Sequence, residues 1–276
     1  MMMLGCTLSV WKMVSPTVVK KAHTFQGDPV ALALWQRFRD LSITKYKDIY
    51  ARLNVEFDVY SGESQYSLSQ MQSVLDELSA LGLLKPDQGA LMVDLKEHKL
   101  GTAIIGKTDG SMLYLSRDIA ANIERKKLYD FDEMFYIVGT QQEHHFKQLF
   151  LILELMGKDW ASKCHHINFG MIKSKDGNMS TRKGSVVFLE EILDQVKEEM
   201  HAVMKKNEVK YAQVVDPVGV SDVVGMSAIM IQDMSARRHK DYEFDWNRML
   251  SFEGDTGPYF LNFAYAVDIS NMRMLD

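Results

Sequence analysis

The sequence predicts an α/β fold with a doubly wound sheet, because strand-like and helix-like segments alternate along the chain. Two short apolar runs, Met112–Leu115 and Met134–Val138, have the length and composition of buried parallel strands. Each run is followed by a helical apolar pattern, one through Ile119 and the other from Phe146. With 276 residues the chain is long enough to bury the core that such a sheet requires.

The segment before these strands predicts a long helix and one further strand. Asp28 and Pro29 form a helix start, an acidic N-cap followed by proline at the first helical position. A helical apolar pattern continues to about Leu53, and we expect a break near Ser42–Thr44. Apolar and polar residues then alternate over Val55–Tyr60, which predicts a strand.

Two more helices follow from local signals. Ser67 and Gln70 have the spacing of a capping box, and Gly82 is placed to end the helix that the box begins. Leu189–Met204 carries apolar residues on one face, which predicts ordinary core packing and no site role.

Composition restricts the class of protein. Hydrophobic residues make up 46% of the chain and charged residues 25%, as in ordinary globular proteins. The formal charge of −5 argues against a general polyanion binder, so any nucleic-acid contact must come from local patches. Cys6 and Cys164 are too few for a disulfide framework, and no Cys/His spacing predicts a zinc site.

Targeting signals also point to a soluble protein. Met1–Trp11 is apolar, but it has no basic residue before it and is too short to span a bilayer. We expect no membrane association and a reducing compartment. The cytoplasm is the predicted location, with the mitochondrion as the alternative, although residues 1–27 lack the character of a transit peptide.

The segment Ser174–Gly184 gathers glycines, hydroxyls and cations in one polar loop. Glycines allow the backbone to approach a phosphate closely, and Arg182 and Lys183 can meet its negative charge. A solvated basic hairpin is the alternative, because short basic loops are common.

Polar residues follow the predicted strands, where ligands bind in open α/β sheets. Glu63, Tyr114, Asp118 and Gln142 stand at these positions. Singly, Asp118 could cap a helix, Glu63 and Gln142 could be surface residues, and Tyr114 could belong to the core. Together, two carboxylates, a phenol and an amide suit the flat donor fork of a guanidinium group.

Several segments of the chain, in this order, resemble arginyl-tRNA synthetase of the eukaryotic cytosolic or fungal type. They are Tyr60–Gln65, Leu113–Asp118, His166–Met171, Met179–Gly184, Met230–Met234 and Leu250–Tyr259. The resemblance implies the second half of a class I Rossmann-type catalytic domain, followed by the beginning of an all-α anticodon-binding domain. We expect the catalytic part over 28–250 and the truncated helical domain over 251–276, with 1–27 unmatched.

The resemblance also implies roles for named residues. Glu63, Tyr114, Asp118 and Gln142 would bind the arginine substrate, in agreement with the guanidinium pocket above. The backbone at His166, Gly170 and Met171 would border the adenine of ATP. The tRNA would be contacted by Gly254, Asp255, Thr256, Gly257, Pro258 and Tyr259.

The basic loop stands where class I enzymes carry Lys-Met-Ser-Lys-Ser, which stabilises the pyrophosphate leaving group. Its residues here are Met179, Ser180, Thr181, Arg182 and Lys183. Asn178 and Thr181 replace the two lysines, so we expect Arg182 and Lys183 to supply the charge.

The resemblance implies an arginine–tRNA ligase that uses L-arginine, ATP with Mg²⁺ and tRNA(Arg), needs bound tRNA before it activates arginine, and has no zinc. The chain lacks the His-x-Gly-His element of class I enzymes; His144-His145 and His165-His166 have neither the spacing nor the glycine. We therefore expect a fragment or divergent product that is inactive alone. The alternative function is a non-catalytic synthetase remnant acting as a binding or assembly module.

Overall fold

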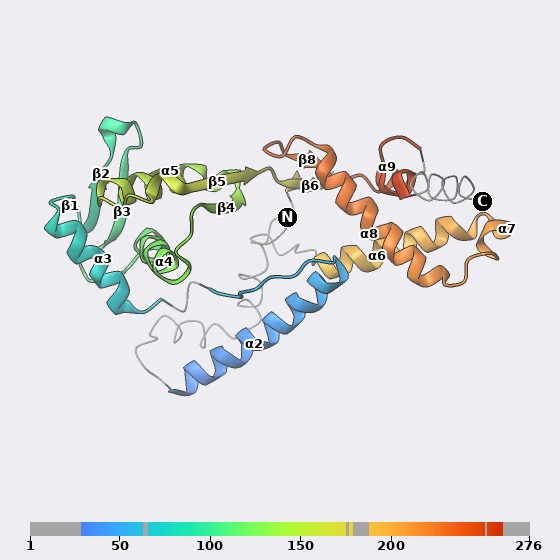
Figure 1. Ribbon diagram of the computed structural model, residues 1–276, viewed down its shortest axis with the longest axis horizontal. Coiled ribbons are helices and arrows are strands. Elements are labelled where there is room, and N and C mark those ends of the chain that lie inside the picture. The colour runs from blue at the N-terminus through green and yellow to red at the C-terminus, as the bar shows by residue number, and fades with distance from the viewer. Residues whose placement is uncertain (1–28, 63–65, 175–176, 179–187, 252, 262–276) are drawn as a thin grey trace. The chain divides into compact units, whose positions relative to one another are not determined.

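The computed structural model describes residues 29–62, 66–174, 177–178, 188–251 and 253–261 (Figure 1). The chain divides into two compact units, one of Val59–Gly170 and the other of Met1–Asp58 with Met171–Asp276. Both units mix helices and strands, which agrees with the predicted α/β class.

A βαβ unit lies at the centre of Val59–Gly170. Strand β4 (Met134–Gly139) pairs in parallel with β5 (Cys164–Phe169), with Met134 opposite Cys164. The chain passes between them through the 3₁₀ turn η4 (Thr140–Gln142), helix α5 (Glu143–Leu155) and the 3₁₀ turn η5 (Ala161–Lys163). The predicted strand over Met134–Val138 and the helix from Phe146 are therefore confirmed.

The same unit contains an antiparallel sheet that the sequence patterns did not predict. Strands β1 (Leu84–Asp87), β2 (Ala90–Asp94) and β3 (Thr102–Lys107) pair in that order, and Figure 1 shows them side by side. Gln88 and Gly89 form the tight β1–β2 turn with φ of 43° and 79°, the backbone that a two-residue hairpin of type I′ requires. The short 3₁₀ turn η3 (Lys96–His98) separates β2 from β3.

Helices α3 (Leu68–Ala80), α4 (Tyr114–Tyr129) and α5 enclose one apolar core with β2 and β3. Fully buried members of this core include Leu78, Leu95, Ile105, Ile119, Leu149, Ile152 and Leu153. Ser67 and Gln70 form the predicted capping box of α3, and Gly82, with φ of 69°, follows its end as expected.

Two predicted strands are wrong. Met112 makes only an isolated bridge to Gly106, and the chain then enters α4 at Tyr114. A short apolar run fits the first turn of a buried helix as well as a strand, so periodicity could not separate them. Residues 55–62 lack regular pairing in the described chain, although their apolar residues alternate. Alternation predicts a strand only where a neighbouring strand is available.

The second unit is mainly helical. It contains α2 (Pro29–Arg52), α6 (Leu189–Lys205), α7 (Glu208–Tyr211), α8 (Pro217–Ser235) and α9 (Trp246–Met249). Helix α2 begins at Pro29 as predicted, but the break expected near Ser42–Thr44 is wrong. The hydroxyls of Ser42 and Thr44 donate to the carbonyls of Phe38 and Asp40, at 2.8 and 3.0 Å, so they remain compatible with a continuous helix.

Helices α6 and α8 pack closely, and their apolar faces form the core of this unit. The buried residues are Ile192, Val196, Met200, Ala228, Phe244, Met249 and Leu250, so the predicted packing role of the Leu189–Met204 face is confirmed. Gly225 of α8 makes the close approach feasible, because a Cβ there would lie 2.6 Å from Cγ1 of Val196.

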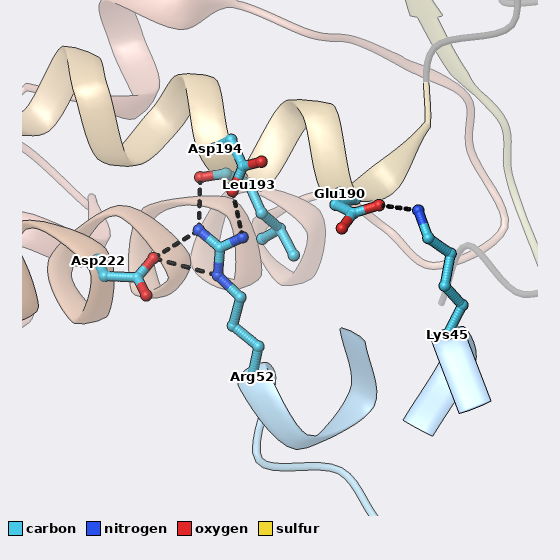
Figure 2. A network of polar contacts seen from close by, with 6 residues as sticks. All are labelled: Lys45, Arg52, Glu190, Leu193, Asp194 and Asp222. Carbon is cyan, nitrogen blue, oxygen red and sulfur yellow. Dashed lines mark hydrogen bonds and ion pairs between the residues drawn. The ribbon is translucent and has the colours of Figure 1, made fainter. Parts of the chain in front are cut away.

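Arg52 ties the end of α2 to this helix pair (Figure 2). Its guanidinium donates to Asp222 Oδ1 at 2.6 and 3.2 Å, to Asp194 Oδ1 at 2.6 Å and to the Leu193 carbonyl at 3.1 Å. About two turns earlier on the same helix, Lys45 bonds Glu190 at 2.6 Å at the surface.

A small three-stranded sheet supports the start of the basic loop. Strand β6 (Ile172–Ser174) lies between β7 (Gly177–Asn178) and β8 (Tyr242–Glu243). The carboxylate of Asp241 accepts the backbone N–H of Met171 at 2.8 Å and pairs with Lys173 Nζ at 2.8 Å. Both interactions lower the pKa of Asp241, with the Lys173 hydrogen bond as the larger cause. The strand that leads into the loop is thus held at its beginning.

Candidate functional site

Asp118 and Tyr114 lie on the first turns of α4. The helix starts at Tyr114 after the N-cap Leu113, which makes no side-chain capping bond. Asp118 is one turn inside the helix, so the alternative that it caps a helix is wrong. Tyr114 is 71% exposed, which also excludes the core role considered for it. Residues four apart lie on one helix face, so the phenol and the carboxylate are neighbours at the surface.

Asp118 is joined to the beginning of α5. Its Oδ2 lies 2.7 Å from Nε2 of His145, and both side chains are about one third exposed. Gln142 ends η4 three residues before His145 and is exposed. The contact therefore joins the first part of α4, where Asp118 lies, to the beginning of α5, which follows Gln142.

A chain of hydrogen bonds fixes α4 against β4 behind this surface. Asn122 donates to the backbone carbonyl of Asp118 at 2.8 Å, and the Tyr136 hydroxyl donates to Oδ1 of Asn122. Arg125 donates to the Tyr136 oxygen at 3.3 Å. Burial raises the pKa of Tyr136 to about 12, so its hydroxyl stays protonated as a donor at neutral pH. The backbone that carries Asp118 is rigidly placed as a result.

The carboxyl ends of β4 and β5 are also linked. Thr140 donates to the Phe169 carbonyl at 2.9 Å. The His166 ring stacks on Phe146 with 4.7 Å between ring centroids, and its Nε2 lies 3.0 Å from the Val138 carbonyl. The imidazole of His166 is thus used for packing on Phe146 and β4, and its predicted place at the border of the adenine stays a prediction.

The remaining predicted residues belong to other parts of the chain. Gly170 follows β5 and is half-buried, whereas Met171 begins the second unit, is 38% exposed and gives its N–H to Asp241. Glu63 and the loop residues Met179, Ser180, Thr181, Arg182 and Lys183 lie outside the described residues.

The predicted tRNA-contact segment is partly a packing element. Thr256, Gly257 and Pro258 are buried, whereas Gly254, Asp255 and Tyr259 are exposed. Thr256 Oγ1 donates to the Ser251 carbonyl at 2.5 Å and accepts the N–H of Tyr259 at 3.3 Å.

Gly257 touches the backbone of α8. A Cβ at Gly257 would lie 2.4 Å from the nitrogen of Ala228 and from the carbonyl carbon of Ser227. The glycine is therefore required for this close contact, whatever the segment binds.

A separate cavity of about 460 Å³ lies beside β5. Phe135, Phe150, His165 and Ile167 contribute to its lining, together with Glu143, Lys147, Cys164, His166 and Asn168. Of the predicted site residues in this unit, only His166 reaches it. Burial raises the pKa of the Cys164 thiol to about 11, so it is neutral and unreactive there.

Two absences hold for the described part of the chain. No group of three or more His, Cys, Asp or Glu residues among the described residues could hold a metal ion. Within those same ranges, no helix is long and apolar enough to cross a membrane.

His145 is the site neighbour that sequence reasoning missed. In the sequence it stands out only through the pair His144-His145, which does not match the His-x-Gly-His element. The sequence signal for His145 is its spacing of three residues from the predicted site residue Gln142, because residues three apart share a helix face. The partner Asp118, 27 residues away, could not be deduced without the packing of α4 on α5.

Comparison with known proteins shows the family of the chain. The family model described as "tRNA synthetases class I (R), catalytic domain" matches residues 16–246, which is most of the chain. The chain therefore belongs to the class I (R) tRNA synthetase catalytic-domain family.

The relatives it matches are arginine–tRNA ligases. The probable cytoplasmic arginine–tRNA ligase of Schizosaccharomyces pombe is 55% identical over 242 residues, covering 87% of this chain and 38% of the relative. The cytoplasmic arginine–tRNA ligase of Saccharomyces cerevisiae is 53% identical over 242 residues, covering 87% and 39%. The chain thus spans about two fifths of the length of these relatives, and the resemblance seen in the sequence is confirmed.

The crystal structure of arginyl-tRNA synthetase from Plasmodium falciparum is similar in fold. Its TM-score is 0.76 at 24% identity, over 95% of this chain and 44% of that one. The catalytic-domain part of the predicted fold class is confirmed by the family match and this likeness.

Proposed function

We propose that the chain performs the arginine-recognising part of arginine–tRNA ligation. Tyr114, Asp118 and Gln142 bind the guanidinium group of L-arginine, with Glu63 at the same pocket. The observation that carries the proposal is the 2.7 Å contact between Asp118 and His145, which joins the starts of α4 and α5. A carboxylate beside a phenol and an amide offers the acceptors that a guanidinium fork requires.

The reaction proceeds in two steps. The arginine carboxylate attacks the α-phosphorus of ATP, the bond to the β-phosphate oxygen breaks, and arginyl-adenylate and pyrophosphate form. The terminal ribose hydroxyl of tRNA then attacks the arginyl carbonyl, and AMP leaves. ATP enters with Mg²⁺. No protein nucleophile is required, so positioning and charge stabilisation carry the catalysis.

Residues of both units supply the other contacts in this proposal. Arg182 and Lys183 stabilise the pyrophosphate, and the backbone at His166, Gly170 and Met171 borders the adenine. Residues 28–250 form the catalytic part, with no structural zinc. Residues 251–276 begin the helical anticodon-binding domain, where Gly254, Asp255 and Tyr259 are the exposed candidates for tRNA contact. The names of the two fungal relatives support a cytoplasmic location.

Calorimetric titration of the 276-residue chain with L-arginine tests arginine recognition. We expect saturable binding by the wild type and none by Asp118→Ala, because the carboxylate that accepts the paired hydrogen bonds of the guanidinium is lost. Asp132→Ala is the matched control, since it removes an exposed acid elsewhere in the same unit. Unchanged binding by Asp118→Ala would remove Asp118 from the pocket.

ATP–pyrophosphate exchange separates ligase chemistry from a purely binding function. Because the sequence lacks a His-x-Gly-His element, we expect the isolated chain to show no arginine-dependent exchange above background, with or without tRNA. Arginine binding without exchange supports the binding role of the isolated chain. Robust exchange would show that this chain forms an ATP site by other residues.

A further inference from the structure

The carboxylate of Asp118 has one side-chain partner among the described residues, the imidazole of His145. Nε2 of His145 lies 2.7 Å from Oδ2, the length of a strong charge-assisted hydrogen bond. A carboxylate offers about four acceptor positions on its two oxygens. The bond to His145 therefore occupies a small part of the acceptor capacity of Asp118.

The other contacts near Asp118 hold its backbone and not its carboxylate. Asn122 donates to the Asp118 carbonyl oxygen at 2.8 Å, and Tyr136 in turn fixes Asn122. These bonds fix the position of α4 and do not involve the carboxylate oxygens of Asp118. His145 makes the hydrogen bond to this carboxylate and so determines its direction, while Arg125 interacts with Asp118 electrostatically.

We propose that His145 is a positioning residue for guanidinium recognition, and this rests on the proposed role of Asp118 in binding arginine. His145 donates its Nε2–H to one oxygen of Asp118 and so fixes the plane in which the carboxylate meets the substrate. The imidazole is held in turn by α5, where His145 lies beside Phe146 with 5.6 Å between ring centroids at 84°.

Such positioning matters for arginine more than for lysine. A guanidinium is a planar fork that pairs with a carboxylate through two parallel bonds, so its affinity depends on the orientation of the carboxylate plane. An ammonium group is a compact point charge that tolerates many orientations. His145 thereby contributes to the choice of arginine over lysine as well as to affinity.

The test compares variants of the full chain by calorimetric titration with L-arginine and with L-lysine. We expect His145→Ala to weaken arginine binding about tenfold, the effect of losing one charge-assisted hydrogen bond. Lysine binding should change less, so the preference for arginine falls. His145→Gln should recover most of the affinity, because its amide N–H reaches a similar position. A purely structural role would not produce this rescue.

His144→Ala is the matched control, since His144 is the adjacent exposed histidine on the same helix and has no role in the proposal. Its binding should equal that of the wild type. If His145→Ala binds arginine as tightly as the wild type while Asp118→Ala does not, the positioning role is refuted and the arginine site stands.

A second measurement does not depend on arginine. Nitrogen-15 NMR of the neutral imidazole should show the Nε2–H tautomer for His145 in the wild type, with a changed tautomer population in Asp118→Ala. An Nδ1–H tautomer in the wild type would overturn the proposal. If the wild type binds no arginine, the proposed function of the chain fails, and this measurement alone decides whether His145 donates to Asp118.

Discussion

Arg52 and Asp118 are the centres of two charged clusters. The charged group of Arg52 is surrounded by partners, whereas that of Asp118 has few. The guanidinium of Arg52 is surrounded by Asp222, Asp194 and the Leu193 carbonyl (Figure 2). Its side chain is 21% exposed. The carboxylate of Asp118 is 34% exposed and is met by His145, its one recorded side-chain partner in the described chain.

In our proposal the difference is that between a structural ion cluster and a recognition site. Arg52 shows how this protein binds a guanidinium of its own, with two carboxylates and a carbonyl around one fork. Near Asp118 the proposed further acceptors, Tyr114 on the same helix and Gln142 before α5, are exposed. Removing the cation of a filled cluster leaves its carboxylates without compensation, whereas an open carboxylate is available to a ligand.

The largest expected effect is on stability and comes from Arg52→Ala. Removing the guanidinium leaves Asp194 and Asp222 close together without their cation, so we expect a loss of about 2–4 kcal/mol in the free energy of unfolding. Urea denaturation followed by circular dichroism measures this loss. The free energy of unfolding of Arg52→Lys should lie between those of the wild type and Arg52→Ala, because an ammonium keeps the charge but lacks the planar donor fork.

Lys45→Ala is the control for this measurement. Lys45 bonds Glu190 from the same helix, but the two side chains are 68% and 45% exposed. Solvent screens such a pair, so we expect no measurable change in stability. Equal effects of Arg52→Ala and Lys45→Ala would mean that the Arg52 cluster is not structural.

The two clusters also show what the sequence could and could not predict. The α2 and α6 helices were predicted from their local patterns, but the partners of Arg52 lie 142 and 170 residues away. Local periodicity carries no information on such contacts. The sequence predicts Asp118 and Gln142 as site residues because each follows a predicted strand. The first of these strands, Met112–Leu115, instead leads into helix α4.

The β1–β3 sheet was missed for a related reason. Its hairpin depends on the positive φ of Gln88 and Gly89, and only the glycine is a typical turn residue. Its strands also contain Pro86 and several charged residues, so their apolar alternation is weak. Helix signals such as the Ser67–Gln70 capping box act over one turn and were therefore easier to recognise.

The second prediction compares a buried and an exposed residue within the segment 254–259. Gly257→Ala would place a methyl group 2.4 Å from the backbone of α8, so we expect a loss of about 1–3 kcal/mol in the free energy of unfolding from overpacking. Asp255→Ala, at an exposed neighbour, should leave urea denaturation unchanged. A Gly257→Ala protein as stable as the wild type would show that the segment is not packed on α8.

The third prediction concerns the stability of the Asp118 cluster itself. Its pair with His145 is partly exposed, so Asp118→Ala should change the free energy of unfolding by less than about 1 kcal/mol. The same variant is expected to abolish arginine binding. Thermal unfolding measured beside the titration separates the two effects. A large loss of stability would mean that Asp118 has a structural role, as Arg52 does.

The smallest expected effect is on the pH dependence of stability and comes from Asp241. This exposed carboxylate holds the beginning of β6 through Met171 and Lys173. Lys173 and the Met171 N–H lower the pKa of its carboxylate in the folded protein. A lowered folded pKa gives a stabilisation that is complete above the unfolded pKa and is lost as the pH falls through the folded value. The wild type should therefore be slightly more stable than Asp241→Asn at pH 7, and the difference should disappear in acid. Urea midpoints of both proteins across that pH range measure it, and a difference that persists below the folded pKa would show that the Asp241 carboxylate does not act through its charge.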